Sequence, residues 1–122
     1  MFEICVKMEF SAAHNLRDYK GKCEKLHGHN WQVEAVFAAA ELNKGAMVMD
    51  FSLAKKILKQ VLAYFDHCYI NDTEYFKKNN PTSENIARFI YTQLSRKTQK
   101  RHCTVKRVSV WETPRGCATY YE

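Results

Sequence analysis

Hydrophobic and polar residues alternate along two stretches in the first third of the chain. Over residues 3–13 every second side chain is apolar, up to Phe10, with charged residues between them. Residues 26–39 repeat the alternation around Trp31. A period of two places alternate side chains on one face of a β-strand. The pattern predicts two long strands that can pair like a hairpin, joined by a polar loop over residues 15–25.

The next two patterned stretches have the period of a helix. Over residues 52–65 apolar side chains recur every three or four positions, and lysines take the opposite side. Asp50 or Ser52 can cap the start of this helix. Residues 83–97 show the same kind of stripe, and Thr82 can act as their N-cap. The sequence therefore predicts two amphipathic helices.

The chain then returns to strand patterns over residues 103–112 and 117–122, separated by the turn "TPRG". The order strand, strand, helix, helix, strand, strand predicts an α+β fold, in which two helices cover one face of a four-stranded antiparallel sheet. Such a sheet leaves its second face and two edges uncovered, and four side chains add apolar surface that needs cover: Val108, Val110, Tyr120 and Tyr121. We therefore expect an oligomer that joins sheets edge to edge.

The composition is that of a globular protein. The chain has 122 residues, of which 46% are hydrophobic and 26% charged, which fits one domain over residues 1–122. It has no apolar run of membrane-spanning length and no secretory signal pattern, so a cytoplasmic location is expected. Five cysteines are an odd number, which favours reduced thiols over a disulfide framework.

The formal net charge of +6 is compatible with an anionic partner. The densest basic run, "SRKTQKRH" over residues 95–102, contains none of the interleaved aromatic residues that are typical of single-strand nucleic-acid binding. A solvated helix end explains the run better. We therefore expect neither a nucleic-acid nor a membrane partner.

The segment "CEKLHGHNW", residues 23–31, concentrates potential metal ligands. His27 and His29 are two positions apart, so on a strand they point to the same face, and His14 ends the neighbouring strand. Three imidazoles leave the fourth zinc position open, as in catalytic sites. Cys23 as a fourth ligand would instead give a closed structural site, and ordinary polar strand residues are a third interpretation. Spacing alone does not choose among them.

Six motifs occur in order along nearly the whole chain: "FSAAH", "CEKLHGHNW", "MVMDF", "DHCYIND", "NPTSENIA" and "WET". As a set they resemble the 6-pyruvoyltetrahydropterin synthase and 6-carboxytetrahydropterin synthase family. The resemblance implies the tunnelling fold, or T-fold, whose subunits form trimeric sheet barrels that stack in pairs. We therefore expect a homohexamer, a dimer of trimers, with sites at the subunit interfaces.

The resemblance also implies roles for individual residues. It implies that His14, His27 and His29 bind Zn²⁺. It implies that Cys23 does not bind the metal and acts as the catalytic thiolate, and that Asp66 and His67 form a proton-transfer pair. It further implies that Glu112 holds the pterin ring by two parallel hydrogen bonds. Thr82, Ser83 and Glu84 resemble a pterin-contact segment, an interpretation that competes with a helix cap.

The reaction implied by the resemblance converts 7,8-dihydroneopterin triphosphate to 6-carboxy-5,6,7,8-tetrahydropterin, with release of acetaldehyde and triphosphate, on the route to queuosine. The segments "CEKLHGH" and "MVMDF" are similar in sequence to those of the bacterial carboxy enzymes. The first alternative is the pyruvoyl reaction of tetrahydrobiopterin synthesis. An alternative of another class is a non-enzymatic zinc module with a basic nucleic-acid-binding surface, which predicts Cys23 as a ligand and no turnover.

Overall fold

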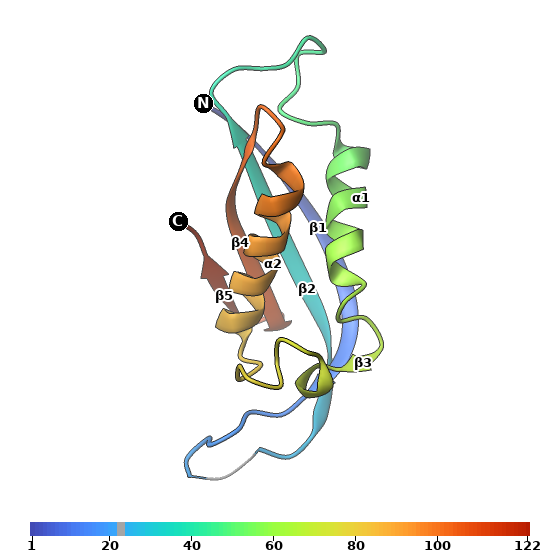
Figure 1. The fold of residues 1–122 in the computed structure, drawn as a ribbon, viewed down its shortest axis with the longest axis vertical. Coiled ribbons are helices and arrows are strands. Elements are labelled where there is room, and N and C mark those ends of the chain that lie inside the picture. Colours follow the sequence, from blue (N-terminus) through green and yellow to red (C-terminus); the bar gives the residue numbers. More distant parts are fainter. Residues whose placement is uncertain (22–23) are drawn as a thin grey trace.

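A computed structural model describes residues 1–21 and 24–122 (Figure 1). In chain order the elements are β1 (Phe2–His14), β2 (His27–Ala39), α1 (Phe51–Leu62), β3 (Cys68–Tyr69), a 3₁₀ turn (Ile70–Asp72), α2 (Ser83–Thr98), β4 (Thr104–Thr113) and β5 (Gly116–Tyr120). All six expected elements are present, although α1 ends at Leu62 rather than at residue 65. The α+β class predicted from the pattern is confirmed.

The sheet has five strands in the order β3-β1-β2-β4-β5. The pairs β1–β2, β2–β4 and β4–β5 are antiparallel, as expected. The prediction of four strands missed β3, which runs parallel to β1 and aligns Cys68 with Ala12 and Tyr69 with Ala13. A strand of two residues is too short to show a period of two, so the hydrophobic pattern could not reveal it.

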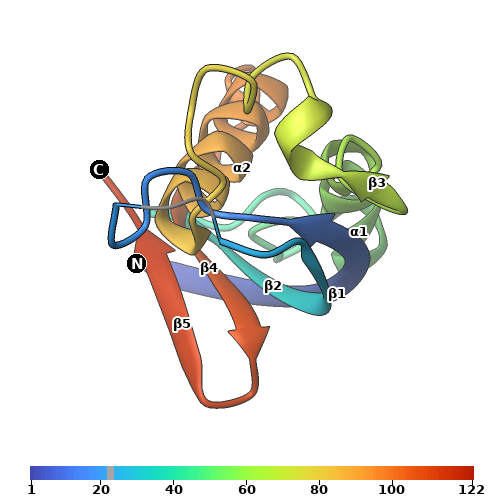
Figure 2. The same cartoon turned by 90° about the horizontal axis from the view of Figure 1, so that it is seen from below.

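Both helices pack on the same face of the sheet, and the core lies between the two layers (Figures 1 and 2). Phe10 stacks on Trp31 with ring centroids 5.7 Å apart, and Phe65 stacks on Phe10 at 5.1 Å. Val108 and Val110 face this core and are fully buried. The expectation that these two valines need cover from another subunit was therefore wrong.

Among the described elements, no helix lies over the other face of the sheet (Figure 2), and this face carries polar side chains. Lys7 pairs with Glu34 at 3.4 Å, and Arg107 pairs with Glu3 at 3.5 Å. Neighbouring strands also exchange a hydrogen bond between the hydroxyls of Ser109 and Thr119. Three polar pairs thus lie across the strands on this face.

Side chains cap both helices at their expected positions. Asp50 accepts the backbone N–H groups of Ser52 and Leu53 at 2.8 and 3.2 Å. Thr82 accepts the N–H of Asn85 at 3.2 Å. Within the residues that the structure describes, no helix is both long and apolar enough to span a membrane. The four described cysteines are free thiols: Cys5, Cys68, Cys103 and Cys117.

Candidate functional site

Three histidine side chains meet at one end of the β1–β2 pair. His14 lies directly opposite His27 in the strand register, and His29 follows on the same face of β2. One ring nitrogen from each histidine lies within 4.8 Å of the others. His14 is only 1% exposed and packs edge-on against Trp31, with ring centroids 4.7 Å apart. The predicted convergence of the three imidazoles is confirmed.

Backbone carbonyls fix the tautomers of His14 and His27. The Nδ1 of His14 lies 2.9 Å from the carbonyl oxygen of Pro81, and the Nδ1 of His27 lies 2.8 Å from that of Lys25. A carbonyl oxygen can only accept, so each Nδ1 carries the hydrogen. In a neutral ring the other nitrogen, Nε2, then holds a free lone pair. Two rings are thus oriented with their free Nε2 nitrogens toward each other.

These free nitrogens are arranged for a cation. The Nε2 atoms of His14 and His27 lie 3.0 Å apart, although neither has a hydrogen to offer the other in the neutral form. Burial lowers the pKa of His14, which disfavours a proton as the bridging cation. The Nε2 of His29 is buried and has no hydrogen-bond partner within the described chain. A metal ion bound by all three nitrogens would satisfy these unpaired groups.

Glu112 brings a carboxylate to the histidine cluster from β4. One of its oxygens lies 3.6 Å from the Nε2 of His14, and the other lies 4.0 Å from the Nε2 of His29. Glu112 is 34% exposed, so the same carboxylate also reaches solvent. A group held by Glu112 would therefore lie beside an ion held by the histidines.

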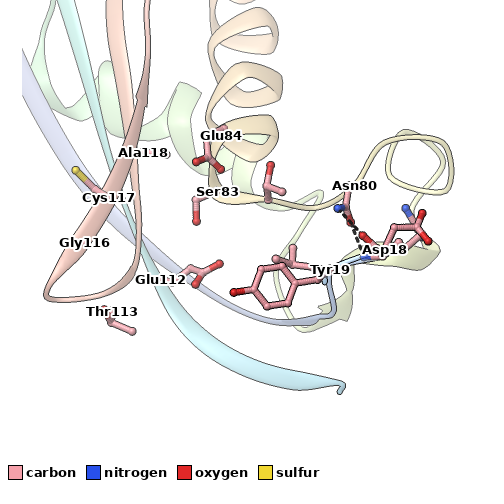
Figure 3. Close-up of a pocket in the computed structure, with 13 residues that line it drawn as sticks. Asp18, Tyr19, Asn80, Ser83, Glu84, Glu112, Thr113, Gly116, Cys117 and Ala118 are labelled. Carbon is pink, nitrogen blue, oxygen red and sulfur yellow. Dashed lines mark hydrogen bonds between the residues drawn. The ribbon is translucent and has the colours of Figure 1, made fainter. Parts of the chain in front are cut away.

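A hollow of about 600 Å³, here called the Glu112 hollow, opens next to this carboxylate (Figure 3). Its walls come from residues 16–19 of the β1–β2 loop, from the start of α2 and from the β4–β5 turn. Thr82, Ser83 and Glu84 all line it together with Glu112. The structure thus brings together the four residues predicted to contact substrate. Thr82 also caps α2, so the competing helix-cap interpretation is correct for that residue.

Asp66 and His67 form a contacting pair at the other side of the cluster. Asp66 Oδ1 lies 3.0 Å from the Nδ1 of His67 and also accepts the backbone N–H of Ser11 at 3.0 Å. The Ser11 bond is the main reason why the pKa of Asp66 is lowered. His67 donates its backbone N–H to the carbonyl of Ser11, and its φ of 56° lies in the left-handed region. This backbone geometry presents an imidazole that is 81% exposed.

His67 also lines a second hollow, of about 550 Å³. Residues 11–13, 28–30 and 67–69 surround it, and His29 is among them. The histidine cluster therefore borders one hollow directly through His29 and adjoins the other through Glu112.

Cys23, the predicted catalytic thiolate, lies outside the described residues. The base of its loop is held by side-chain amides that the sequence analysis did not single out. Asn71 exchanges hydrogen bonds with the backbone of Asn15, at 3.0 and 2.8 Å, and Asn80 does the same with Arg17, at 2.8 and 3.1 Å. Asparagines in loops often bind backbone groups, but their spacing does not reveal which backbone they bind.

Comparisons with known proteins agree over nearly the whole chain. Residues 3–122 match the family described as 6-pyruvoyl tetrahydropterin synthase. The 6-carboxy-5,6,7,8-tetrahydropterin synthase of Haemophilus influenzae is 33% identical over 144 residues and covers 100% of both chains. The Bacillus subtilis protein of the same name is 34% identical, and its alignment covers 98% of this chain and 84% of the B. subtilis chain.

Solved structures show the same fold. The 6-pyruvoyl tetrahydropterin synthase of Caenorhabditis elegans matches with a TM-score of 0.84 at 25% identity, covering 99% of this chain and 95% of that one. The Plasmodium vivax structure of the same name matches with a TM-score of 0.79 at 24% identity, covering 99% and 97%.

Proposed function

This chain belongs to the 6-pyruvoyl tetrahydropterin synthase family, and we propose that it is a zinc-dependent lyase that acts on 7,8-dihydroneopterin triphosphate. The proposed products are 6-carboxy-5,6,7,8-tetrahydropterin, acetaldehyde and triphosphate, which places the enzyme on the route to queuosine. The family relationship and the T-fold support the pterin chemistry, and the names of the curated relatives favour the carboxy product. The whole of residues 1–122 then forms one such domain.

The observation that carries this proposal is the set of three converging imidazole nitrogens beside Glu112. A tetrahedral zinc ion with bonds of about 2.1 Å separates its ligand nitrogens by roughly 3.4 Å, which suits nitrogens within 4.8 Å of one another. His14, His27 and His29 would hold the ion and leave its fourth position open. Zinc bound there supplies Lewis acidity toward a substrate oxygen.

Glu112 is proposed to bind the edge of the pterin ring. That edge carries an amino group and a ring N–H side by side, and a carboxylate can accept both in parallel. Ser83 and Glu84, at the start of α2, line the same hollow and offer further polar contacts. Because Glu112 lies 3.6 Å from the Nε2 of His14, a ring held by Glu112 would lie next to the histidine cluster.

Cys23 is proposed as the thiolate that moves protons on the side-chain carbons, a role that rests on the family resemblance. Asp66 and His67 are proposed as the second proton-transfer group. The 3.0 Å contact between their side chains supports this role, since a carboxylate can hold an imidazole in a fixed orientation. Loss of protons at the side chain would accompany departure of triphosphate.

We also propose a homohexamer in the cytoplasm, with active sites between subunits. One observation in its support is the His67 imidazole, which contacts Asp66 and is otherwise exposed in the described chain. A second is the position of β5 at the edge of the described sheet. An exposed catalytic imidazole becomes useful when a neighbouring subunit supplies the rest of the site. The substrate is the only partner proposed, without a nucleic-acid or membrane partner.

Product analysis tests the function directly. Zinc-loaded protein is incubated with dihydroneopterin triphosphate without oxygen, and mass spectrometry measures 6-carboxytetrahydropterin and 6-pyruvoyltetrahydropterin while acetaldehyde is assayed in parallel. Carboxy product with acetaldehyde is expected. Pyruvoyl product without acetaldehyde would assign the chain to the biopterin branch. If folded, zinc-bound protein formed neither product, the proposed enzyme activity would be refuted.

The role of Cys23 has its own test. In Cys23→Ala we expect zinc to be retained and turnover to be lost, because three histidines suffice to hold the ion. Loss of zinc together with the fold would instead identify Cys23 as a ligand of a structural site. Zinc content by mass spectrometry and thermal unfolding distinguish the two outcomes.

A further inference from the structure

The Glu112 hollow contains a feature that the proposed roles leave unused. Tyr19 is the one aromatic side chain among its described lining residues, and it is 49% exposed. Figure 3 shows its ring beside Glu112, projecting from the β1–β2 loop into the space in front of the start of α2. Large aromatic side chains usually gain stability by burial, so a half-exposed ring on the wall of a hollow favours a ligand contact.

The backbone holds this ring in place at a conformational cost. Asp18 and Lys20, the residues on either side of Tyr19, have φ values of 55° and 52°. Residues other than glycine rarely adopt this left-handed region, and they stay there when the surrounding structure holds them. Two such residues around one exposed aromatic side chain indicate a loop shaped to present that side chain.

The segment before Tyr19 is firmly attached to the rest of the molecule. Arg17 forms the reciprocal backbone pair with Asn80 described above, and its guanidinium donates to the carbonyls of Asn71 and Asn79, each at 3.3 Å. These contacts join the loop to the segment that leads into α2. Tyr19 therefore stands at a defined place relative to the opposite wall of the hollow.

The ring also has one face available to a ligand. The ammonium of Lys20 lies 5.3 Å from the ring centroid, on one side of it. The other side can receive a flat heteroaromatic ring, and stacking of such rings on tyrosine is a common means of recognising nucleobase-like groups. Glu112 recognises the hydrogen-bonding edge of such a ring, but it provides no surface for its face.

We propose that Tyr19 stacks on the flat bicyclic ring of the substrate while Glu112 binds its edge, which makes Tyr19 a specificity-determining residue of this site. The inference rests on the proposed function and extends it to the recognition of the ring. It predicts that binding depends on the aromatic ring of residue 19 and not on its hydroxyl.

Neopterin, which has the ring but no phosphates, is the probe for stacking, and its binding is followed by its fluorescence. Tyr19→Leu should weaken binding about tenfold, the size of one aromatic stacking contact. Tyr19→Phe should bind within about twofold of the wild type, because it keeps the ring. Tyr121→Leu is the matched control, since Tyr121 is 69% exposed and does not line the hollow. It should leave binding unchanged.

Inorganic triphosphate, which has no ring, serves as the second probe, and its inhibition constant should be the same in wild type and in Tyr19→Leu. Equal weakening of both probes would show a collapsed loop and overturn the stacking role. Wild-type affinity in Tyr19→Leu, or loss in Tyr19→Phe as large as in Tyr19→Leu, would also overturn it. If neither zinc-loaded wild-type protein nor its Glu112→Gln variant bound neopterin, both this inference and the proposed function would fail.

Discussion

Replacement of His29 by leucine separates metal binding from folding. Leucine removes the ring nitrogens while it keeps an apolar side chain of similar size in the site. The Nε2 of His29 is buried without a partner in the described chain, and such an atom costs about 1–3 kcal/mol. The His29 ring also makes edge contacts with the rings of His14, His27 and Trp31, and their loss costs about 0.5–1.5 kcal/mol each. These opposing effects should leave the metal-free variant within about 1 kcal/mol of the wild type.

The metal-loaded proteins should differ much more. An ion at 100 times its dissociation constant stabilises the folded protein by about 2.7 kcal/mol. An unfolding entropy of about 2.1 cal/mol/K per residue gives about 0.26 kcal/mol/K for 122 residues. Saturating zinc should therefore raise the melting temperature of the wild type by about 10 °C, and His29→Leu should lose most of this rise.

Thermal unfolding with chelator and with zinc measures both quantities for the wild type and the variant. His67→Leu is the matched control, because His67 lies on the surface outside the three-histidine cluster and should keep the full zinc response. A full response in His29→Leu would show that the three imidazoles do not bind one ion together. A metal-free His29→Leu that was several kcal/mol less stable would show that relief of the unpaired nitrogen does not offset the lost ring contacts.

Three further predictions concern single groups. Asp50→Ala should lower the free energy of unfolding in denaturant by about 1 kcal/mol and leave kcat unchanged, because it removes only the cap of α1; a drop in kcat would contradict this. Glu112→Gln should weaken neopterin binding about tenfold or more in the fluorescence assay, since a charged acceptor is lost, and unchanged affinity would remove Glu112 from the ring site. In metal-free protein, burial lowers the pKa of His14, so the unfolded chain binds a proton that the folded chain does not. Stability in urea should therefore fall as the pH drops below about 6.5, and this fall should be smaller in His14→Gln.

The sequence was sufficient to predict the long elements and the histidine cluster. Period-two alternation located β1 and β2, and the spacing of His27 and His29 placed both on one face. His14 followed because it ends a strand that pairs with the next one. These predictions depend on local geometry, which repeats along a strand and is therefore readable from spacing.

The contacts that orient the site could not be predicted in this way. The bond from His14 to the carbonyl of Pro81 joins groups 67 positions apart, and the amide pairs of Asn71 and Asn80 span 56 and 63 positions. β3 forms because Asp66 and His67 attach the chain to Ser11, which is again a contact between distant segments. Such contacts depend on the packing of the whole chain and leave no periodic signal.

The strand register around the histidines also makes the bound ion a cross-link. β1 ends at His14 and β2 begins opposite it at His27, so an ion bound to both would close the chain between them into a ring. Closing such a ring costs chain entropy when the ion binds, and the amide pairs of Asn71 and Asn80 already fasten the first residues of the same ring. Ion and amide pairs would then strengthen each other, because coupling between two binding events is reciprocal. A change at Asn80 would therefore alter the affinity for the ion without touching any of its ligands.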